Sequence, residues 1–130
     1  MPEPRACDVV IVGAGIAGSA LALALAGRGL SIAVVEAQPV APTVLPLERD
    51  VASFDSRVSA LTPRSRDFLQ SIGAWDAISG YRLCAYRHMT VWDADGTGQI
   101  EFDCAEVDAG LLGYIVENRA VVASLLERIA

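Results

Sequence analysis

The stretch from residue 9 to residue 27 carries no charged side chain, and it constrains the fold more than any other part of the sequence. Its first residues are β-branched and do not alternate with polar ones, which is typical of a short strand buried on both faces. After a group of glycines the stretch becomes rich in Ala and Leu, which favour helix. A second β-branched run follows. The sequence therefore predicts a β-α-β unit with parallel strands, made of strand 8–12, helix 16–26 and strand 31–36.

An uncharged run of this length is also compatible with a membrane span or a secretory signal. The residues before it include Glu3 and Asp8 as well as Arg5, whereas a signal sequence begins with a positive region. Its many glycines and alanines give only a modest gain in hydrophobicity. We therefore favour the β-α-β unit.

Gly13, Gly15 and Gly18 form a GxGxxG motif between the predicted strand and the predicted helix. Gly13 permits a tight turn, Gly15 lets the backbone approach a pyrophosphate, and Gly18 allows the helix to pack closely on the strand. The start of the helix offers unpaired N–H groups and a partial positive charge to phosphates. The motif predicts a dinucleotide site formed by the consecutive residues Gly13, Ala14, Gly15, Ile16, Ala17 and Gly18.

Glu36 ends the second predicted strand, where a carboxylate can accept hydrogen bonds from the ribose hydroxyls of an adenine dinucleotide. Its charge would repel a 2′-phosphate, so NADP is disfavoured at this particular site. On these residues alone FAD and NAD remain alternatives, as does a glycine-rich turn that binds no ligand.

The composition excludes several classes of partner. The formal net charge is −6 and the basic residues are scattered, whereas nucleic acids and anionic lipid surfaces require clustered Lys and Arg. Cys7, Cys84 and Cys104 contain no CxxC pattern and are odd in number, which favours a reducing cytoplasm. The single histidine, His88, is expected at a polar strand position, and no metal site is predicted.

Further elements are expected along the rest of the chain. Thr62 and Pro63 are typical of an N-cap and a first helical residue, and Gly73 is expected to end that helix. Trp92 and Phe102 are expected in the core. The expected segments are an irregular loop 39–54, a helical turn 74–79, strands 87–93 and 99–103 joined as a hairpin, strand 111–117 and a helix from residue 118. The expected buried helix stripes are Phe68, Leu69 and Ile72, and Val122, Leu125, Leu126 and Ile129.

Three segments resemble a known family. They are VVIVGAGIAGSALALALAGRGLSIAVVE at residues 9–36, DSRVSALTPRSRDFLQSIGAWDAI at residues 55–78 and GYIVENRAVVASLLERI at residues 113–129. The hairpin YRHMTVWDADGTGQIEFD also takes part. Together they resemble flavoprotein monooxygenases of the para-hydroxybenzoate hydroxylase type, and more closely the ring hydroxylases of ubiquinone biosynthesis.

This resemblance implies an α/β fold: a Rossmann-like FAD-binding domain over residues 1–130 with an inserted antiparallel hairpin. The hairpin, at about residues 86–104, would belong to the sheet next to the substrate, and contact with the substrate is the alternative to core burial for Trp92 and Phe102. The resemblance also implies that Arg57 and Arg119 contact FAD, Arg119 by bidentate bonds to the pyrophosphate. The alternatives are a surface or ion-paired Arg57, with Asp55 or Glu48 as its partner, and an Arg119 that faces solvent. For Asn118 a capping role is favoured over a cofactor role.

The resemblance further implies that the complete enzyme hydroxylates a phenolic or quinol precursor of ubiquinone with NADH or NADPH and O₂. The flavin supplies that chemistry, so no catalytic residue is nominated in this chain. A prenylated substrate would come from the membrane, which implies a cytoplasmic protein at the periphery of the inner membrane or in a biosynthetic complex. The family's later Gly-Asp motif and much of its substrate domain are missing from the sequence. We therefore expect a C-terminally truncated domain whose missing segments complete it.

Two other interpretations remain. The first is a different FAD-dependent oxidoreductase, or an NAD-binding dehydrogenase domain, that shares only the GxGxxG segment. The second is a nucleotide-binding fragment without catalysis.

Overall fold

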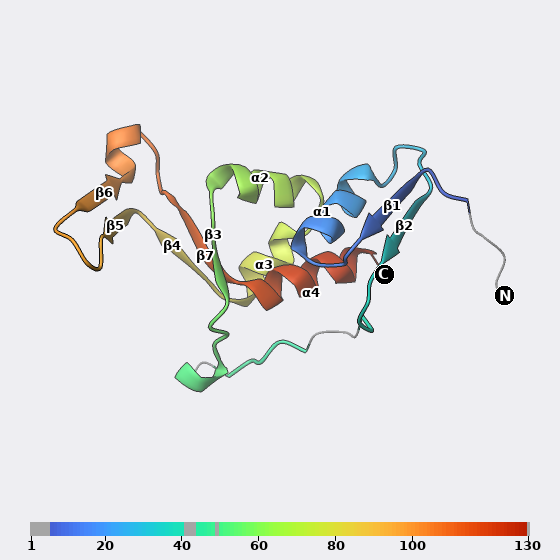
Figure 1. Cartoon of the computed structure of the whole chain (residues 1–130), viewed down its shortest axis with the longest axis horizontal. Coiled ribbons are helices and arrows are strands. Elements are labelled where there is room, and N and C mark those ends of the chain that lie inside the picture. The colour runs from blue at the N-terminus through green and yellow to red at the C-terminus, as the bar shows by residue number, and fades with distance from the viewer. Residues whose placement is uncertain (1–5, 41–43, 49, 130) are drawn as a thin grey trace.

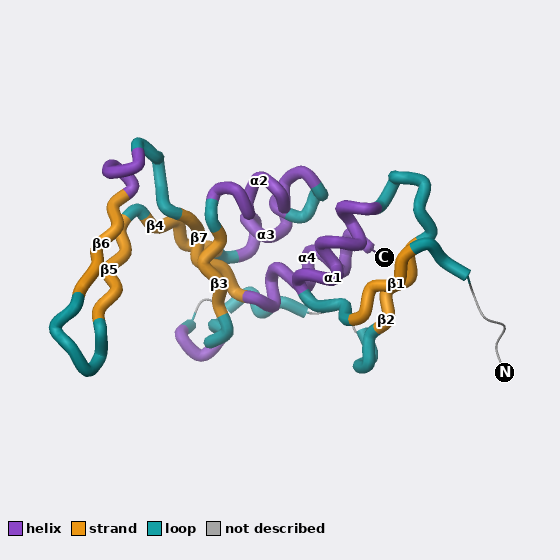
Figure 2. The backbone as a smooth tube through the Cα atoms, turned by 45° about the horizontal axis from the view of Figure 1, so that its top comes forward, coloured by secondary structure: helices purple, strands orange, loops and turns teal. Residues whose placement is uncertain are grey.

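The structure is a computed structural model that describes residues 6–40, 44–48 and 50–129. Its elements are spread along a long axis (Figure 1). A parallel strand pair lies at one end, helices and a three-stranded sheet occupy the middle, and a hairpin projects at the other end. Figure 2 shows the same separation of the two-stranded pairs from a second direction.

The predicted β-α-β unit is confirmed. Strands β1 (Val9–Val12) and β2 (Ile32–Val35) pair in parallel, and helix α1 (Ile16–Leu25) connects them. The expectation that both strands are fully buried is wrong, because Val12 is 85% exposed and Val35 is 53% exposed. Among the described residues this sheet has two strands, and α1 packs on it. Side chains of successive strand residues point to opposite faces, and Val10, Val12 and Val35 remain exposed within the described residues.

The central sheet has the antiparallel order β3-β7-β4. Strand β7 (Gly113–Glu117), which the sequence predicts, lies between β3 (Val58–Leu61) and β4 (Leu83–Tyr86). Both flanking strands were missed in the sequence, because each has only four residues and neither shows a clear alternation of polar and apolar side chains. Their pairing with β7 brings the segment before β3 against the start of the last helix.

The predicted hairpin is also confirmed, as β5 (His88–Trp92) and β6 (Gln99–Asp103) in antiparallel pairing. The prediction that Trp92 and Phe102 lie in the core is wrong, since they are 69% and 43% exposed. A two-stranded ribbon buries a side chain only where a further layer covers it, and no such layer covers these two in the described part of the chain. The 3₁₀ helix η2 (Cys104–Val107) follows β6.

The described residues form three further helices, α2 (Pro63–Ser71), α3 (Trp75–Tyr81) and α4 (Asn118–Ile129). They lie on the side of the central sheet that faces β1 and β2 (Figure 1). The predicted start of α2 is confirmed, because Thr62 Oγ1 accepts a hydrogen bond from the Ser65 N–H at 3.2 Å and Pro63 is the first helical residue. Gly73, with φ of 75°, ends this segment as expected. The predicted irregular loop contains the 3₁₀ helix η1 (Val51–Ser53), and its residues 41–43 and 49 lie outside the described residues.

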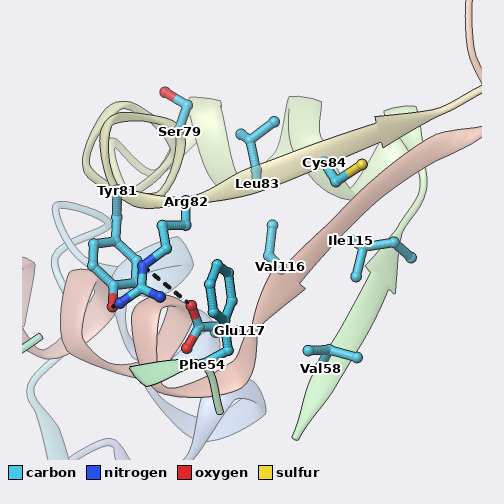
Figure 3. Close-up of a pocket in the computed structure, with 10 residues that line it drawn as sticks. All are labelled: Phe54, Val58, Ser79, Tyr81, Arg82, Leu83, Cys84, Ile115, Val116 and Glu117. Carbon is cyan, nitrogen blue, oxygen red and sulfur yellow. Dashed lines mark hydrogen bonds and ion pairs between the residues drawn. The ribbon is translucent and has the colours of Figure 1, made fainter. Parts of the chain in front are cut away.

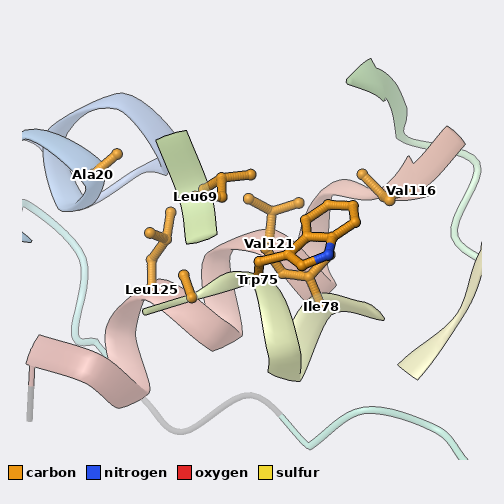
Figure 4. Close-up of a cluster of buried hydrophobic side chains, with 8 residues drawn as sticks. Ala20, Leu69, Trp75, Ile78, Val116, Val121 and Leu125 are labelled. Carbon is orange, nitrogen blue, oxygen red and sulfur yellow. The ribbon is translucent and has the colours of Figure 1, made fainter. Parts of the chain in front are cut away.

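The core joins α1, α2, α3, α4 and β7 (Figure 4). The buried stripe of α4 differs from the predicted one: Leu125 is buried as expected, but Ile129 is exposed, and Val122 and Leu126 are only half-buried. Both α1 and α3 pack on α4, and the buried residues of α4 are Ala120, Val121, Ser124 and Leu125. Phe68 of α2 is likewise 43% exposed. The buried cluster consists of Ala20, Leu69, Ala74, Trp75, Ile78, Val116, Val121 and Leu125.

Replacing Leu125 by alanine is expected to destabilise the protein by about 2–5 kcal/mol, the usual cost of a cavity left by a fully buried leucine. The matched change Leu126→Ala removes the same atoms from a half-buried position on the same helix and is expected to cost less. Urea unfolding followed by circular dichroism measures both values. Equal losses for the two variants would contradict the assignment of the buried face.

Candidate functional site

The glycine loop leaves β1 and turns across the end of β2. Gly13 has φ of 102°, a region that glycine adopts without strain, and its N–H donates to the Val35 carbonyl at 2.7 Å. The Ser19 hydroxyl, fully buried, donates to the Ala14 carbonyl at 2.9 Å. These bonds fix the path of the loop between the strand and α1.

The three glycines of the motif stand in different surroundings. A Cβ on Gly18 would lie 2.0 Å from the Gly13 carbonyl oxygen, so the helix and the loop are in direct backbone contact there. A Cβ on Gly15 would meet no atom within 4 Å, and its φ is an ordinary −72°. Gly15 therefore faces open space, which is the arrangement that lets a ligand approach the backbone.

The N-terminus of α1 has the properties of an anion site. Gly15 is the N-cap residue, no side chain among the described residues caps the helix, and the first turn contains no acidic residue. The first N–H groups of a helix have no partner within the helix, and they carry a partial positive charge. Beside this helix start, a pocket of about 440 Å³ is lined by Ile16, Ala17, Leu61, Thr62, Arg64 and Phe68, among others.

Glu36 lies at the end of β2, next to the loop. Its Oε2 accepts a hydrogen bond from the Ala14 N–H at 2.8 Å, and its Oε1 accepts one from the Gln38 N–H at 3.1 Å. The bond from Ala14, with a smaller contribution from Gln38, lowers the pKa of the Glu36 carboxyl. The carboxylate is therefore charged at neutral pH, and its contact with the loop is lost only as the pH falls through that lowered pKa.

The structure brings Arg57 and Arg119 into neighbouring segments. The Asn118 N–H donates to the Arg57 carbonyl at 2.9 Å, because β3 begins beside the end of β7. Arg57 is exposed, and its side chain has no hydrogen bond or ion pair with any described residue. Its N–H, rather than its guanidinium, contacts Asp55, at 2.9 Å.

Arg119 does not face solvent freely, since its side chain is only 26% exposed. Its Nε and Nη2 donate to Glu117 Oε2 at 2.8 and 2.5 Å, and Nη2 also donates to the Ser53 carbonyl. Burial disfavours the charged guanidinium, but the bonds to Glu117 outweigh it and the pKa of Arg119 is raised. Asn118 Oδ1 accepts from the Ser59 hydroxyl at 2.5 Å, a contact that ties α4 to β3.

Sequence reasoning missed Glu117 and Arg82, whose side chains are 4% and 9% exposed. They line a pocket of about 450 Å³ between β3, β4 and β7 (Figure 3). The Arg82 guanidinium lies over the rings of Phe54 and Tyr81, at 4.3 and 4.7 Å from their centroids. The only sequence signal for Glu117 was an acidic residue at the end of an apolar run, a pattern that many exposed residues share.

Neither a metal site nor a membrane-spanning helix is found within residues 6–40, 44–48 and 50–129. No group of three His, Cys, Asp or Glu side chains there could hold a metal ion, and none of the described helices has the length and apolar character to cross a bilayer. His88 lies exposed on β5 with its Nδ1 3.1 Å from Asp103 Oδ2, at the polar strand position that was expected. Cys7, Cys84 and Cys104 are free thiols.

The sequence matches known proteins over most of its length and a family model over its first part. Residues 8–43 match the family described as FAD dependent oxidoreductase. The chain is 38% identical over 118 residues to 3-demethoxyubiquinol 3-hydroxylase of Escherichia coli, covering 91% of this chain and 29% of that protein. It is 38% identical over 127 residues to mitochondrial ubiquinone biosynthesis monooxygenase COQ6 of Mus musculus, covering 94% of this chain and 25% of that protein.

A comparison of structures gives the same fold. The crystal structure of PqsL from P. aeruginosa matches 95% of this chain with a TM-score of 0.64 and 23% identity, and the match covers 30% of that protein. The chain spans between a quarter and a third of the length of these relatives. The chain therefore belongs to the family of FAD-dependent hydroxylases of ubiquinone biosynthesis and corresponds to the N-terminal portion of its members.

Proposed function

We propose that this chain forms the FAD-binding part of a monooxygenase that hydroxylates a phenolic or quinol precursor of ubiquinone, with NADH or NADPH as electron donor and O₂ as the second substrate. The observation that carries the proposal is the open Gly15 at the uncapped start of α1, beside the Glu36 carboxylate. The sequence identity with the ubiquinone hydroxylases supports the choice of reaction.

The residues present fit the adenine dinucleotide part of FAD. The first N–H groups of α1 would bind the pyrophosphate oxygens, and Glu36 would accept hydrogen bonds from the adenosine ribose hydroxyls. Arg57 and Arg119 would add positive charge and donors for the cofactor. When bound, FAD supplies the oxygen and electron chemistry, while these residues bind and orient it.

The direct test is a titration of the purified protein with FAD, followed by quenching of flavin fluorescence, with NAD as competitor. We expect saturable binding that excess NAD does not displace. Displacement of FAD by NAD at comparable concentration would instead assign the site to a nicotinamide dinucleotide.

Glu36→Ala is expected to weaken FAD binding by about tenfold or more, the scale for loss of a hydrogen bond to a charged group. The variant loses both the proposed ribose acceptor and the bond that holds the Ala14 N–H. Glu36→Gln keeps one acceptor oxygen, so its FAD affinity is expected to lie between those of the wild type and of Glu36→Ala. The same fluorescence titration measures all three proteins, and an unchanged affinity of Glu36→Ala would remove Glu36 from the site.

Arg57→Ala and Arg119→Ala are each expected to weaken FAD binding by about tenfold, because each removes charge-assisted hydrogen bonds. Arg28→Ala is the matched control, an exposed arginine beyond the C-terminal end of α1, opposite the glycine loop. Wild-type affinity in both test variants would favour a protein that shares only the GxGxxG segment with the hydroxylases.

A second candidate is a different FAD-dependent oxidoreductase, which the match of residues 8–43 alone would favour. Consumption of NAD(P)H by the FAD-loaded protein, measured with and without a prenylated phenol, separates the two. Stimulation by the phenol supports the hydroxylase, and oxidation of amines or amino acids without it supports the alternative. Absence of any turnover beside tight FAD binding supports a non-catalytic nucleotide-binding fragment.

We further propose that residues 1–130 form the FAD-binding domain and that the β5–β6 hairpin belongs to the sheet on the substrate side. Its exposed apolar residues, among them Trp92 and Phe102, suit a surface that further protein or substrate covers.

A prenylated substrate would place the protein at the cytoplasmic side of the inner membrane or in a biosynthetic complex. Flotation with liposomes that contain a long-chain quinone tests this placement.

A further inference from the structure

We propose that Glu117 is a positioning residue that holds both Arg57 and Arg119 in place for FAD. The inference rests on the proposed function, because it concerns the two arginines that are proposed to contact the cofactor. Glu117 is the last residue of β7, directly before the helix that carries Arg119. Its own role would be exerted through the arginines.

Glu117 contacts Arg119 directly. Glu117 Oε2 accepts hydrogen bonds from Arg119 Nε at 2.8 Å and from Arg119 Nη2 at 2.5 Å. The two donors of one guanidinium edge converge on a single buried oxygen, which restricts the rotation of the side chain. An arginine side chain otherwise loses considerable conformational entropy when a ligand orders it, so an arginine that is already held binds at lower cost.

Glu117 also contacts the loop of residues 55–57, which contains Arg57. The same Oε2 atom accepts a hydrogen bond from the Asp55 N–H at 2.9 Å. Asp55 Oδ1 in turn accepts from the Arg57 N–H at 2.9 Å, and the Arg57 carbonyl accepts from Asn118. One carboxylate oxygen therefore ties the loop 55–57 to the segment 117–119.

The buried negative charge of Glu117 is compensated by neighbouring arginines. A carboxylate whose side chain is only 4% exposed is costly to bury unless cations and donors compensate it. Arg82 Nε lies 3.6 Å from the other oxygen, Oε1, which has no hydrogen-bond partner among the described residues. Arg82 itself donates hydrogen bonds to the Pro46 carbonyl and the Tyr81 hydroxyl, and Figure 3 shows its guanidinium between Tyr81 and Glu117. Arg82 thus balances the charge through Oε1 and leaves Oε2 for Arg119 and Asp55.

A purely structural role for Glu117 makes a different prediction from a positioning role. If Glu117 only stabilises the fold, its loss affects FAD binding equally whether or not the arginines are present. If it acts through them, its loss has little effect on a protein that already lacks them, because coupled residues are not additive. The two cases therefore separate in a double-mutant comparison.

The experiment uses the protein as it is naturally produced and measures FAD affinity together with unfolding of the FAD-free form. Glu117→Met alone would leave Arg82 buried without a counter-charge, so it is made in an Arg82→Met background, where both charges of the buried pair are removed together. Relative to Arg82→Met, we expect the added Glu117→Met to weaken FAD by about tenfold or more. Glu117→Gln in that background keeps an acceptor oxygen and is expected to recover part of the affinity.

The decisive comparison adds Arg57→Ala and Arg119→Ala to the Arg82→Met background. There, Glu117→Met is expected to change FAD affinity by less than about threefold. An undiminished effect in this background, or no effect when both arginines are present in a folded protein, would overturn the positioning role. Failure of the proposed function gives a different result: in that case substitutions in the glycine loop leave the FAD affinity unchanged.

Discussion

Replacing Gly15 by leucine is expected to abolish FAD binding while the protein still folds. The site of the new side chain is open space in the protein, with no atom within 4 Å of a Cβ, and φ at this residue is accessible to leucine. The side chain would occupy the volume over the α1 N-terminus that the pyrophosphate needs. We expect a stability loss of only about 1 kcal/mol, because leucine is a poor N-cap residue.

Gly110→Leu is the matched control, since it adds the same side chain at another exposed glycine with no neighbour within 4 Å. It is expected to leave FAD affinity unchanged. Gly15→Ala should show an intermediate loss, because its side chain is shorter. Fluorescence titration and thermal unfolding are measured on all three variants, and wild-type affinity of Gly15→Leu would show that this loop does not hold the phosphates.

Replacing Gly18 by alanine is expected to destabilise the protein itself by about 1–3 kcal/mol, the range for overpacking a tight contact. The added Cβ would lie 2.0 Å from the Gly13 carbonyl oxygen and 3.2 Å from Ile11 Cγ2, so the loop or the helix must move. The sign is diagnostic, because glycine to alanine inside a helix otherwise stabilises by about 1 kcal/mol.

Gly80→Ala provides the control for that sign. Gly80 lies within α3 and has no neighbour within 4 Å of an added Cβ, so its replacement is expected to be neutral or stabilising. Urea unfolding of both variants measures the change in the free energy of unfolding for each. A stabilised Gly18→Ala variant would mean that α1 does not pack on the glycine loop as closely as the structure has it.

The backbone geometry of the proposed nucleotide site was largely predictable from the sequence. Its parts lie within one β-α-β unit, where short-range rules fix the order of strand, turn and helix. The glycines define where the backbone must be close or open, and Glu36 follows at the end of the next strand. What the sequence did not reveal is the bond from Ala14 to Glu36, which depends on how the two strand ends face each other.

The burial pattern was less predictable. The expectation that Trp92 and Phe102 are core residues came from their apolar character, but burial depends on whether another layer covers them. The stripe on α4 was misplaced for a related reason, because apolar periodicity shows that a helix has a buried face but not how its neighbours turn it. The strands β3 and β4 are stabilised by pairing with β7, and a four-residue strand carries little pattern of its own.

The sequence by itself determined the β-α-β unit, the glycine loop and the acidic residue beside it, because these depend on neighbours along the chain. Only the tertiary structure decided that Glu117 is buried between Arg82 and Arg119 and that it reaches the loop before Arg57. The contacts of Glu117 with Asp55 and Arg82 join segments that are far apart in sequence. They depend on the pairing of β7 with β3, where Val58 lies opposite Glu117, and with β4, where Leu83 lies opposite Val116. The register of a strand pair depends on the whole sheet, and no local pattern contains it.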